Sequence, residues 1–286
     1  MTTETGGCSP AQKKTATESE IRVRTGAVIT LTGILVLYFS RYAYVLEAAA
    51  AMLSIMGIVE LLRAAKCCTW YNVLLLSLIA AAVCMRRLPY YTEILLFVWV
   101  LAIVAFALFM SRMKEVRSIG FWHILPCALM LPIFFYSAVE IRRWPQGLAV
   151  LIFVTLGCTV NDVGAYFVGR AVGTHKLAPT ISPGKTVEGG LGGMVSSVIL
   201  MSLIASLYSR CAGVEIRYGW LFLYLFLASI VGQLGDLAMS TIKRTVGIKD
   251  FSRVLPGHGG ILDRFDSFLF VAPFAVLYGN MTGCFL

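Results

Sequence analysis

The sequence predicts an all-α integral membrane protein, a polytopic bundle of about nine transmembrane helices. Three observations support this fold class. Hydrophobic residues make up 58% of the chain and charged residues only 14%. The mean hydropathy of +0.81 is well above that of soluble domains. Long apolar stretches recur along the chain without the alternating ten-residue pattern of a membrane β-barrel.

A membrane-spanning helix needs about 20 mostly apolar residues. The chain offers such stretches at 25–40, 44–62, 70–85, 92–111, 121–139, 147–166, 189–208, 219–239 and 267–284, of which the first and third are short. Lipid gives backbone groups no hydrogen-bond partner, so each stretch is expected to be helical. We expect residues 1–24 to form a disordered polar tail without a cleaved signal peptide, and 25–145 to form the N-terminal transmembrane helices. Residues 146–286 then form a C-terminal transmembrane domain that carries the chemistry.

Basic residues indicate the orientation. With a cytoplasmic N-terminus, 17 of the 24 Lys and Arg residues fall on the cytoplasmic face and 7 on the opposite face. The positive-inside rule favours this arrangement, which places the polar loops 167–188 and 240–266 in the cytoplasm. We therefore expect a multi-pass protein of the cell inner membrane or plasma membrane. The net charge of +9 follows from this distribution and does not predict a nucleic-acid partner.

The first polar segment runs from 161 to 193. Asn161 and Asp162 lie near the end of the sixth span, where an ionisable group is costly unless it faces a polar cavity. Donors for a phosphate follow along a glycine-rich loop, at Lys176, Ser182, Lys185 and Thr186. The run Gly184-Lys185-Thr186 resembles the end of a P-loop, but Pro179 stands where that motif requires Gly, so a Walker A site is rejected. Glu188 either compensates the dipole of the seventh helix or contacts a cation or a loop lysine.

The second segment, 240–267, concentrates acids and bases. On a helix, Asp236, Ser240 and Lys243 share one face. Asp263 and Asp266 also share a face if the ninth helix has begun there. Such carboxylates predict a site for a hard cation such as Mg²⁺, which takes oxygen ligands. The alternative is that Asp263 and Arg264 only cap the ninth helix.

His258 lies between glycines, in the run Gly-His-Gly-Gly. It either donates a hydrogen bond to a phosphate or holds the loop. The sequence leaves these two roles open.

Both segments resemble the signature of the phosphatidate cytidylyltransferase family, also called CDP-diacylglycerol synthases. The matching residues of the second segment are Ser240, Lys243, Arg244, Lys249, Asp250, Pro256, His258, Gly259, Gly260, Asp263, Arg264 and Asp266. Those of the first segment are Asn161, Asp162, Ala165, Tyr166, Gly169, Arg170, Lys176, Leu177, Ser182, Pro183, Lys185, Thr186 and Glu188. The N-terminal half is similar only in hydropathy.

The resemblance implies a membrane enzyme with cytoplasmic catalytic loops that converts CTP and phosphatidic acid into CDP-diacylglycerol and pyrophosphate. It implies a homodimer among membrane lipids, with Mg²⁺ held by Asp236, Asp263 and Asp266 and with K⁺ as the candidate second cation. The candidate catalytic residues are Asp236, Lys243, Arg244, Asp250, His258, Asp263 and Asp266. The candidate substrate-binding residues are Asn161, Asp162, Lys176, Ser182, Lys185, Thr186, Ser240, Lys249 and Arg264.

Two other interpretations remain. A related enzyme, either a CTP-dependent lipid kinase or an ether-lipid cytidylyltransferase, would share this membrane fold. A transporter of phosphorylated anions would also use basic loops and intramembrane acids. Transporters often consist of repeated halves, however, whereas the charged motifs here fall only in the second half.

Overall fold

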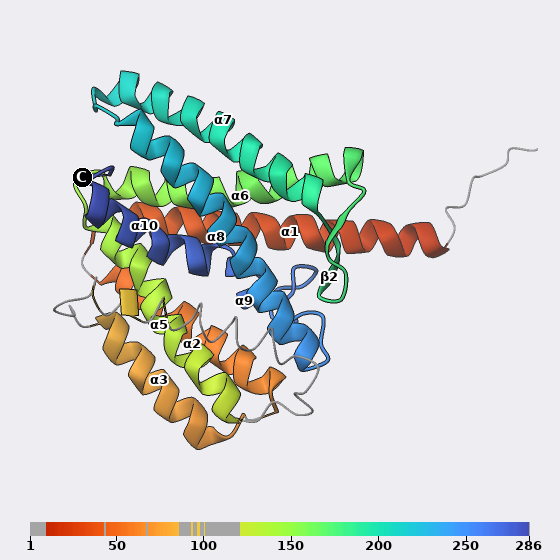
Figure 1. Cartoon of the computed structure of the whole chain (residues 1–286). Coiled ribbons are helices and arrows are strands. Elements are labelled where there is room, and N and C mark those ends of the chain that lie inside the picture. Colours follow the sequence, from red (N-terminus) through yellow and green to blue (C-terminus); the bar gives the residue numbers. More distant parts are fainter. Residues whose placement is uncertain are drawn as a thin grey trace, which may run out of the picture.

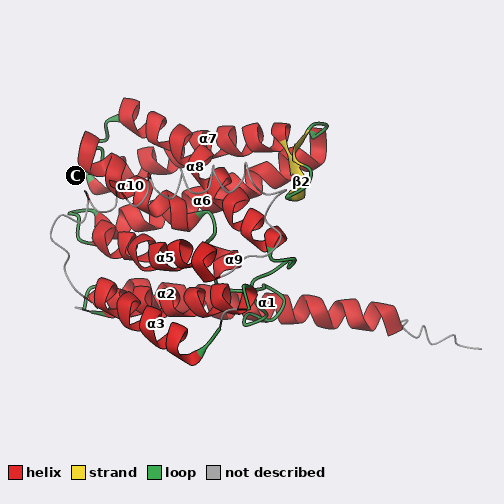
Figure 2. Ribbon diagram, turned by 60° about the horizontal axis from the view of Figure 1, so that its bottom comes forward, coloured by secondary structure: helices red, strands yellow, loops and turns green. Residues whose placement is uncertain are grey.

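The computed structural model describes residues 10–42, 44–66, 68–85 and 121–285, with single residues between 93 and 100. It is a bundle of long helices (Figures 1 and 2). The helices are α1 (Pro10–Phe39), α2 (Val45–Ala64), α3 (Trp70–Met85), α5 (Phe121–Arg142), α6 (Gly147–Val172), α7 (Val187–Ala212), α8 (Tyr218–Thr245), α9 (Leu262–Phe265) and α10 (Phe268–Thr282). The short strands β1 (Lys176–Ala178) and β2 (Ser182–Thr186) form an antiparallel hairpin between α6 and α7.

The all-α membrane class is confirmed. Five of the described helices are long and apolar enough to cross a membrane, and the segments Trp70–Ala81 and Phe268–Thr282 are shorter apolar helices. The predicted span at 92–111 lies almost entirely outside the described residues. The tail prediction differs from the structure, because residues 10–24 continue α1 as one helix. Their polar side chains do not interrupt a helix, since Lys, Gln, Glu and Arg have good helix propensity.

Two groups of helices make up the bundle (Figure 2). The helices α2, α3 and α5 pack against one another, and α7 packs against both α6 and α8. The C-terminal helix α10 joins the groups because it contacts both α5 and α8. Ile58 of α2, Phe135 of α5 and Val276 of α10 are completely or almost completely buried in the shared core.

Glycine lets α6 and α7 approach closely. An added Cβ at Gly193 would lie 2.5 Å from the backbone oxygen of Asn161, and one at Gly189 would lie 2.8 Å from that of Ala165. Small residues four apart on one helix face are the usual means by which membrane helices pack at short range. This packing fixes the C-terminal half of α6, which carries Asn161 and Asp162, beside the start of α7.

The loops sort to the two ends of the bundle. At one end, Arg142 donates a 2.9 Å hydrogen bond to the Ser40 hydroxyl, and Tyr208 donates to Gln146. At the other end, Arg244 in the last turn of α8 donates a 3.0 Å hydrogen bond to the carbonyl of Ile181 in the hairpin. The two polar segments therefore meet at one end, as their predicted placement on one face of the membrane requires.

The α6–α7 packing gives a first test. Gly193→Ala places a methyl group against a backbone oxygen that cannot rotate away, so we expect a loss of roughly 1–3 kcal/mol of stability, as in overpacked cores. The control is Gly157→Ala on α6, where an added Cβ meets nothing within 4 Å. It should be neutral or stabilising by up to about 1 kcal/mol through helix propensity. Thermal unfolding of both variants in detergent makes the comparison, and equal melting temperatures would contradict it.

Candidate active site

A polar cavity of about 530 Å³ lies where α6, α7 and α8 meet the hairpin and α9. This volume is within the range of about 300–1,000 Å³ of small-molecule sites. Four carboxylates line it, at Asp162, Asp236, Asp263 and Asp266. Hydroxyl and basic groups face the same space, at Tyr166, Arg170, Ser182, Lys185 and Thr186. The structure thus brings residues of both predicted segments into one site.

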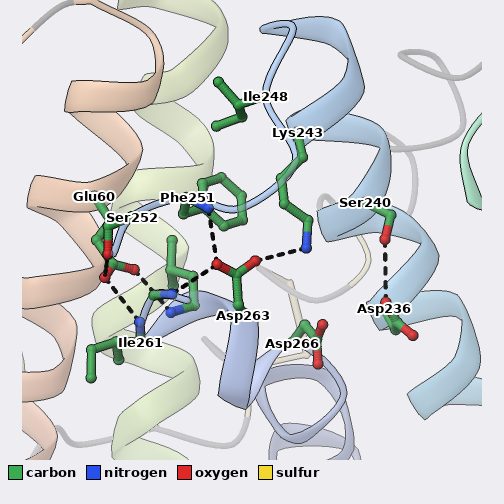
Figure 3. A network of polar contacts seen from close by, with 12 residues as sticks. Glu60, Asp236, Ser240, Lys243, Ile248, Phe251, Ser252, Ile261, Asp263 and Asp266 are labelled. Carbon is green, nitrogen blue, oxygen red and sulfur yellow. Dashed lines mark hydrogen bonds and ion pairs between the residues drawn. The ribbon is translucent and has the colours of Figure 1, made fainter. Parts of the chain in front are cut away.

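Asp236 on α8 has two partners in the described part of the chain. Lys185, which the hairpin carries over the cavity, forms an ion pair with it. The hydroxyl of Ser240, one helical turn further along α8, lies 3.3 Å from its Oδ1 and donates to it. The predicted shared face of Asp236 and Ser240 is therefore confirmed, and Figure 3 shows their contact.

Asp263 is more buried than Asp236 and has more hydrogen-bond partners (Figure 3). Its side chain is 3% exposed, and its Oδ1 lies 2.7 Å from the ammonium of Lys243. Its Oδ2 accepts hydrogen bonds of 2.9 Å from the backbone N–H groups of Phe251 and Gly260. A carboxylate has about four lone-pair sites, so these three donors leave room for about one more contact. Gly260 lies before the N-cap residue Ile261, so this contact holds the loop and does not cap α9.

Asp266 differs from Asp263 in its partners. Its Oδ1 accepts a 2.8 Å hydrogen bond from the backbone N–H of Ser267, and it forms no salt bridge with the residues described. Burial, and then the nearby carboxylate of Asp236, raise the pKa of Asp266 above its ordinary value. Burial and the neighbouring carboxylate thus both disfavour the ionised form of Asp266, which lines the cavity.

The three predicted metal ligands line one cavity, but they do not form a ready-made metal site. Within the described ranges, no group of three His, Cys, Asp or Glu residues could hold a metal ion. The physical reason is that two of the three carboxylates already form ion pairs. Asp236 pairs with Lys185, and Asp263 pairs with Lys243.

Arg244 and Lys243 act through other residues. Arg244 donates to the carbonyls of Ile181 and Ile248 at 3.0 and 3.1 Å, so it ties the hairpin to the end of α8. The ammonium group of Lys243 forms an ion pair with Asp263. Neither of these side chains is among the residues that line the cavity, and their contact with substrate phosphates stays a prediction.

Other predicted site residues also lie outside the cavity lining. Lys249, Asp250 and Arg264 are exposed to solvent. Lys176 on β1 neighbours Leu177, which lines the cavity, and successive strand residues point to opposite faces.

His258 faces α1 instead of the cavity. An added Cβ on Gly26 of α1 would lie 3.5 Å from its Nε2, and its buried Nδ1 has no hydrogen-bond partner among the described residues. Gly257 and Gly259 have φ angles of +75° and +84°, which turn the loop in this direction. Of the two roles left open, the structure favours holding the loop.

Thr186 and Glu188 have structural partners. The Thr186 hydroxyl accepts a 3.1 Å hydrogen bond from the N–H of Gly189 and so caps α7. Glu188 accepts hydrogen bonds from the backbone and side chains of Thr174 and His175, at 2.6–3.2 Å. Glu188 thus fastens the base of the hairpin, and among the described residues it contacts neither a lysine nor the acidic cluster.

Several residues of the site were not among the candidate site residues, and Tyr166 of the cavity lining is one of them. Arg170 lines the cavity, and its position beside Gly169 in the first motif was the available signal. Gln233 donates to Asn161 Oδ1 at 3.3 Å and to the carbonyl of Gly190 at 2.9 Å, and so joins three helices. Glu60 of α2 contacts the loop before α9, far from either motif in the sequence.

The fold and site together define a multi-pass membrane protein with a cavity lined by four carboxylates and two basic side chains. The chain belongs to the cytidylyltransferase family, because the model of that family matches residues 20–282. It is also similar to curated proteins named phosphatidate cytidylyltransferase. The relative from Bacillus subtilis (strain 168) is 42% identical over 64% of this chain. Those from Staphylococcus saprophyticus and Staphylococcus aureus (strain COL) are 48% and 47% identical over 45% of it. The matched parts cover 65% of the first relative and 48% of the other two.

The buried ion pair gives a second test. Lys243→Met removes the charge that faces Asp263, and breaking a buried pair costs about 3–5 kcal/mol. We expect a loss toward the lower end, because Asp263 keeps its two N–H donors. The double variant Lys243→Met/Asp263→Asn should lose less stability than the sum of the losses of the two single variants. A double-mutant cycle measured by thermal unfolding checks this, and strict additivity would show that the two groups do not interact.

Proposed function

We propose that this protein is a phosphatidate cytidylyltransferase, which transfers CMP from CTP to phosphatidic acid and releases pyrophosphate. The observation that carries the proposal is the cavity, in which Lys185 and Arg170 face four carboxylates at the ends of membrane helices. Family membership and the names of the relatives support it. We place this cavity and the N-terminus on the cytoplasmic side, where the basic residues gather.

The proposed reaction needs charge stabilisation more than proton transfer. The phosphomonoester of phosphatidic acid carries about −1.5 to −2 charges at pH 7. Its oxygen forms a bond to the α-phosphorus of CTP, while the bond to the bridging oxygen of the β-phosphate breaks and pyrophosphate leaves. The site must bring two anions together, which fixed positive groups favour. Lys185 and Arg170, both on the cavity wall, are the side chains placed to contact the phosphates.

Carboxylate oxygens are the ligands that a hard cation takes, although among the described residues no three of them converge into a metal site as the structure stands. Asp236 and Asp266 would hold Mg²⁺ in the proposed enzyme, and Asp263 would add at most about one oxygen contact. When bound, Mg²⁺ neutralises and orients nucleotide phosphates. K⁺ remains our candidate for a second cation. Asp162, on the facing helix α6, gives the cavity a further carboxylate for either ion or for the nucleotide.

Labelled nucleotide separates this function from its rivals. Purified protein in lipid nanodiscs would receive phosphatidic acid, Mg²⁺ and CTP labelled at either the α- or the γ-phosphate. A cytidylyltransferase moves the α-label into lipid, whereas a lipid kinase moves the γ-label. An ether-linked phosphatidic acid offered as substrate tests for an ether-lipid cytidylyltransferase. Uptake of CTP into proteoliposomes without chemical conversion would indicate a transporter.

The third test concerns the carboxylates that line the cavity. Asp236→Asn and Asp266→Asn should each lower kcat by about 10²–10³-fold, as expected for removal of a group that stabilises transition-state charge. Asp263→Asn should also abolish turnover while the protein still inserts into the membrane. Removal of divalent cations with EDTA should stop the reaction, and added Mg²⁺ should restore it. The control is Glu215→Gln, an exposed acid between α7 and α8 that does not line the polar cavity. Near-normal turnover of both Asp236→Asn and Asp266→Asn would refute the assignment.

A further inference from the structure

Glu60 of α2 is a buried carboxylate outside both motifs, and it is 2% exposed. Its Oε1 accepts hydrogen bonds from the Ser252 hydroxyl at 2.6 Å and from the N–H of Ile261 at 2.9 Å. Its Oε2 accepts one from the N–H of Leu262 at 3.0 Å. An ionisable residue on a membrane helix indicates a function by default, because its burial there is costly.

Two carboxylates divide the backbone donors at the start of α9 (Figure 3). Asp263 accepts from Gly260, and Glu60 accepts from the next two residues, Ile261 and Leu262. The first N–H groups of a helix have no partner within that helix. A helix of four residues is far too short to be stable alone, so α9 depends on such outside partners.

The close fit depends on Gly260. An added Cβ at this position would lie 2.7–2.9 Å from the carboxylate atoms of Glu60. Glu60 therefore reaches the backbone of the signature segment directly. Through Ser252 it also holds the other end of the loop, so that one side chain closes residues 252–261 into a ring.

We infer that Glu60 is a positioning residue: it fixes α9 against α2, and α9 in turn presents Asp263 and Asp266 to the cavity. This role links the N-terminal helices to the chemistry of the C-terminal domain. Glu60 does not line the cavity, so it acts through α9 and not on the substrate. The kinetic consequence rests on the proposed function, but the structural one does not.

The first arm of the test needs no turnover. Glu60→Gln keeps the size of the side chain but replaces one acceptor oxygen by a donor. Glu47→Gln is the matched control, because Glu47 lies on the same helix at the other end and pairs with Arg143. Hydrogen exchange measured by mass spectrometry should speed up in peptides covering 251–266 in Glu60→Gln, while the hairpin 174–186 stays as in the wild type. Glu47→Gln should leave 251–266 unchanged.

The second arm is kinetic. Glu60→Gln should raise the Mg²⁺ concentration for half-maximal activity by about 10–100-fold, the usual effect of losing a group that orients metal ligands. A merely structural defect would lower the amount of active enzyme without moving that concentration. Ser252→Ala removes one of the three donors to Glu60 and should give a smaller shift in the same direction. It also serves if Glu60→Gln does not fold.

Unchanged exchange in 251–266 in both Glu60→Gln and Ser252→Ala would overturn the inference. So would an Mg²⁺ dependence identical to that of Glu47→Gln in both variants. If the wild type forms no liponucleotide at all, the proposed function fails, and the exchange measurement still decides whether Glu60 holds α9.

Discussion

The contact between Lys243 and Asp263 joins the end of α8 to the start of the last transmembrane segment, and the site depends on it. The two residues lie 20 positions apart, on either side of a loop that crosses from α8 toward α2. Asp263 uses its remaining oxygen to hold the backbone at two points of that loop, Phe251 and Gly260. One buried carboxylate thus sets the spacing of α8, the loop and α9, and with it the distance between Asp236 and Asp266.

The opposite wall of the cavity has a different origin. There the close packing of α6 on α7 depends on glycines such as Gly189 and Gly193 and not on charge. The hairpin leaves this pair of helices with its base fastened by Glu188 and its tip tied to α8 by Arg244. Lys185 is carried across the cavity in consequence. Close helix packing and buried ion pairing therefore build the two walls separately, and the cavity lies between them.

The sequence predicted much of this arrangement because its strongest signals are local. Hydropathy places the helices, and helical spacing places Asp236 and Ser240 on one face. The meeting of the two motifs followed from the number of spans between them. The partners of each charge could not be predicted in this way. Glu60 is 192 residues from Ser252, and nothing in a single sequence reports such a contact. The helix α9 has only four residues, too few to show a period. The direction of His258 could not be predicted for a similar reason, since it depends on two positive φ angles in the loop.

The acids and bases of the site differ in how firmly they are held, and this difference bears on the proposed chemistry. The side chains of Lys185 and Asp236 are 27% and 25% exposed, whereas those of Lys243 and Asp263 are 10% and 3% exposed. Ion pairs open to solvent contribute only about 0–1 kcal/mol, while breaking a buried pair costs about 3–5 kcal/mol. Under the proposed function, Lys185 would leave Asp236 and bind a substrate phosphate. Asp236 would then bind a cation in place of Lys185. Each of these two side chains would thus keep a partner of opposite charge, and only the more exposed pair, Lys185 with Asp236, would separate. The stronger pair keeps α8 and α9 in place while substrates enter and leave, so the same four charges supply both the movable and the fixed parts of the site.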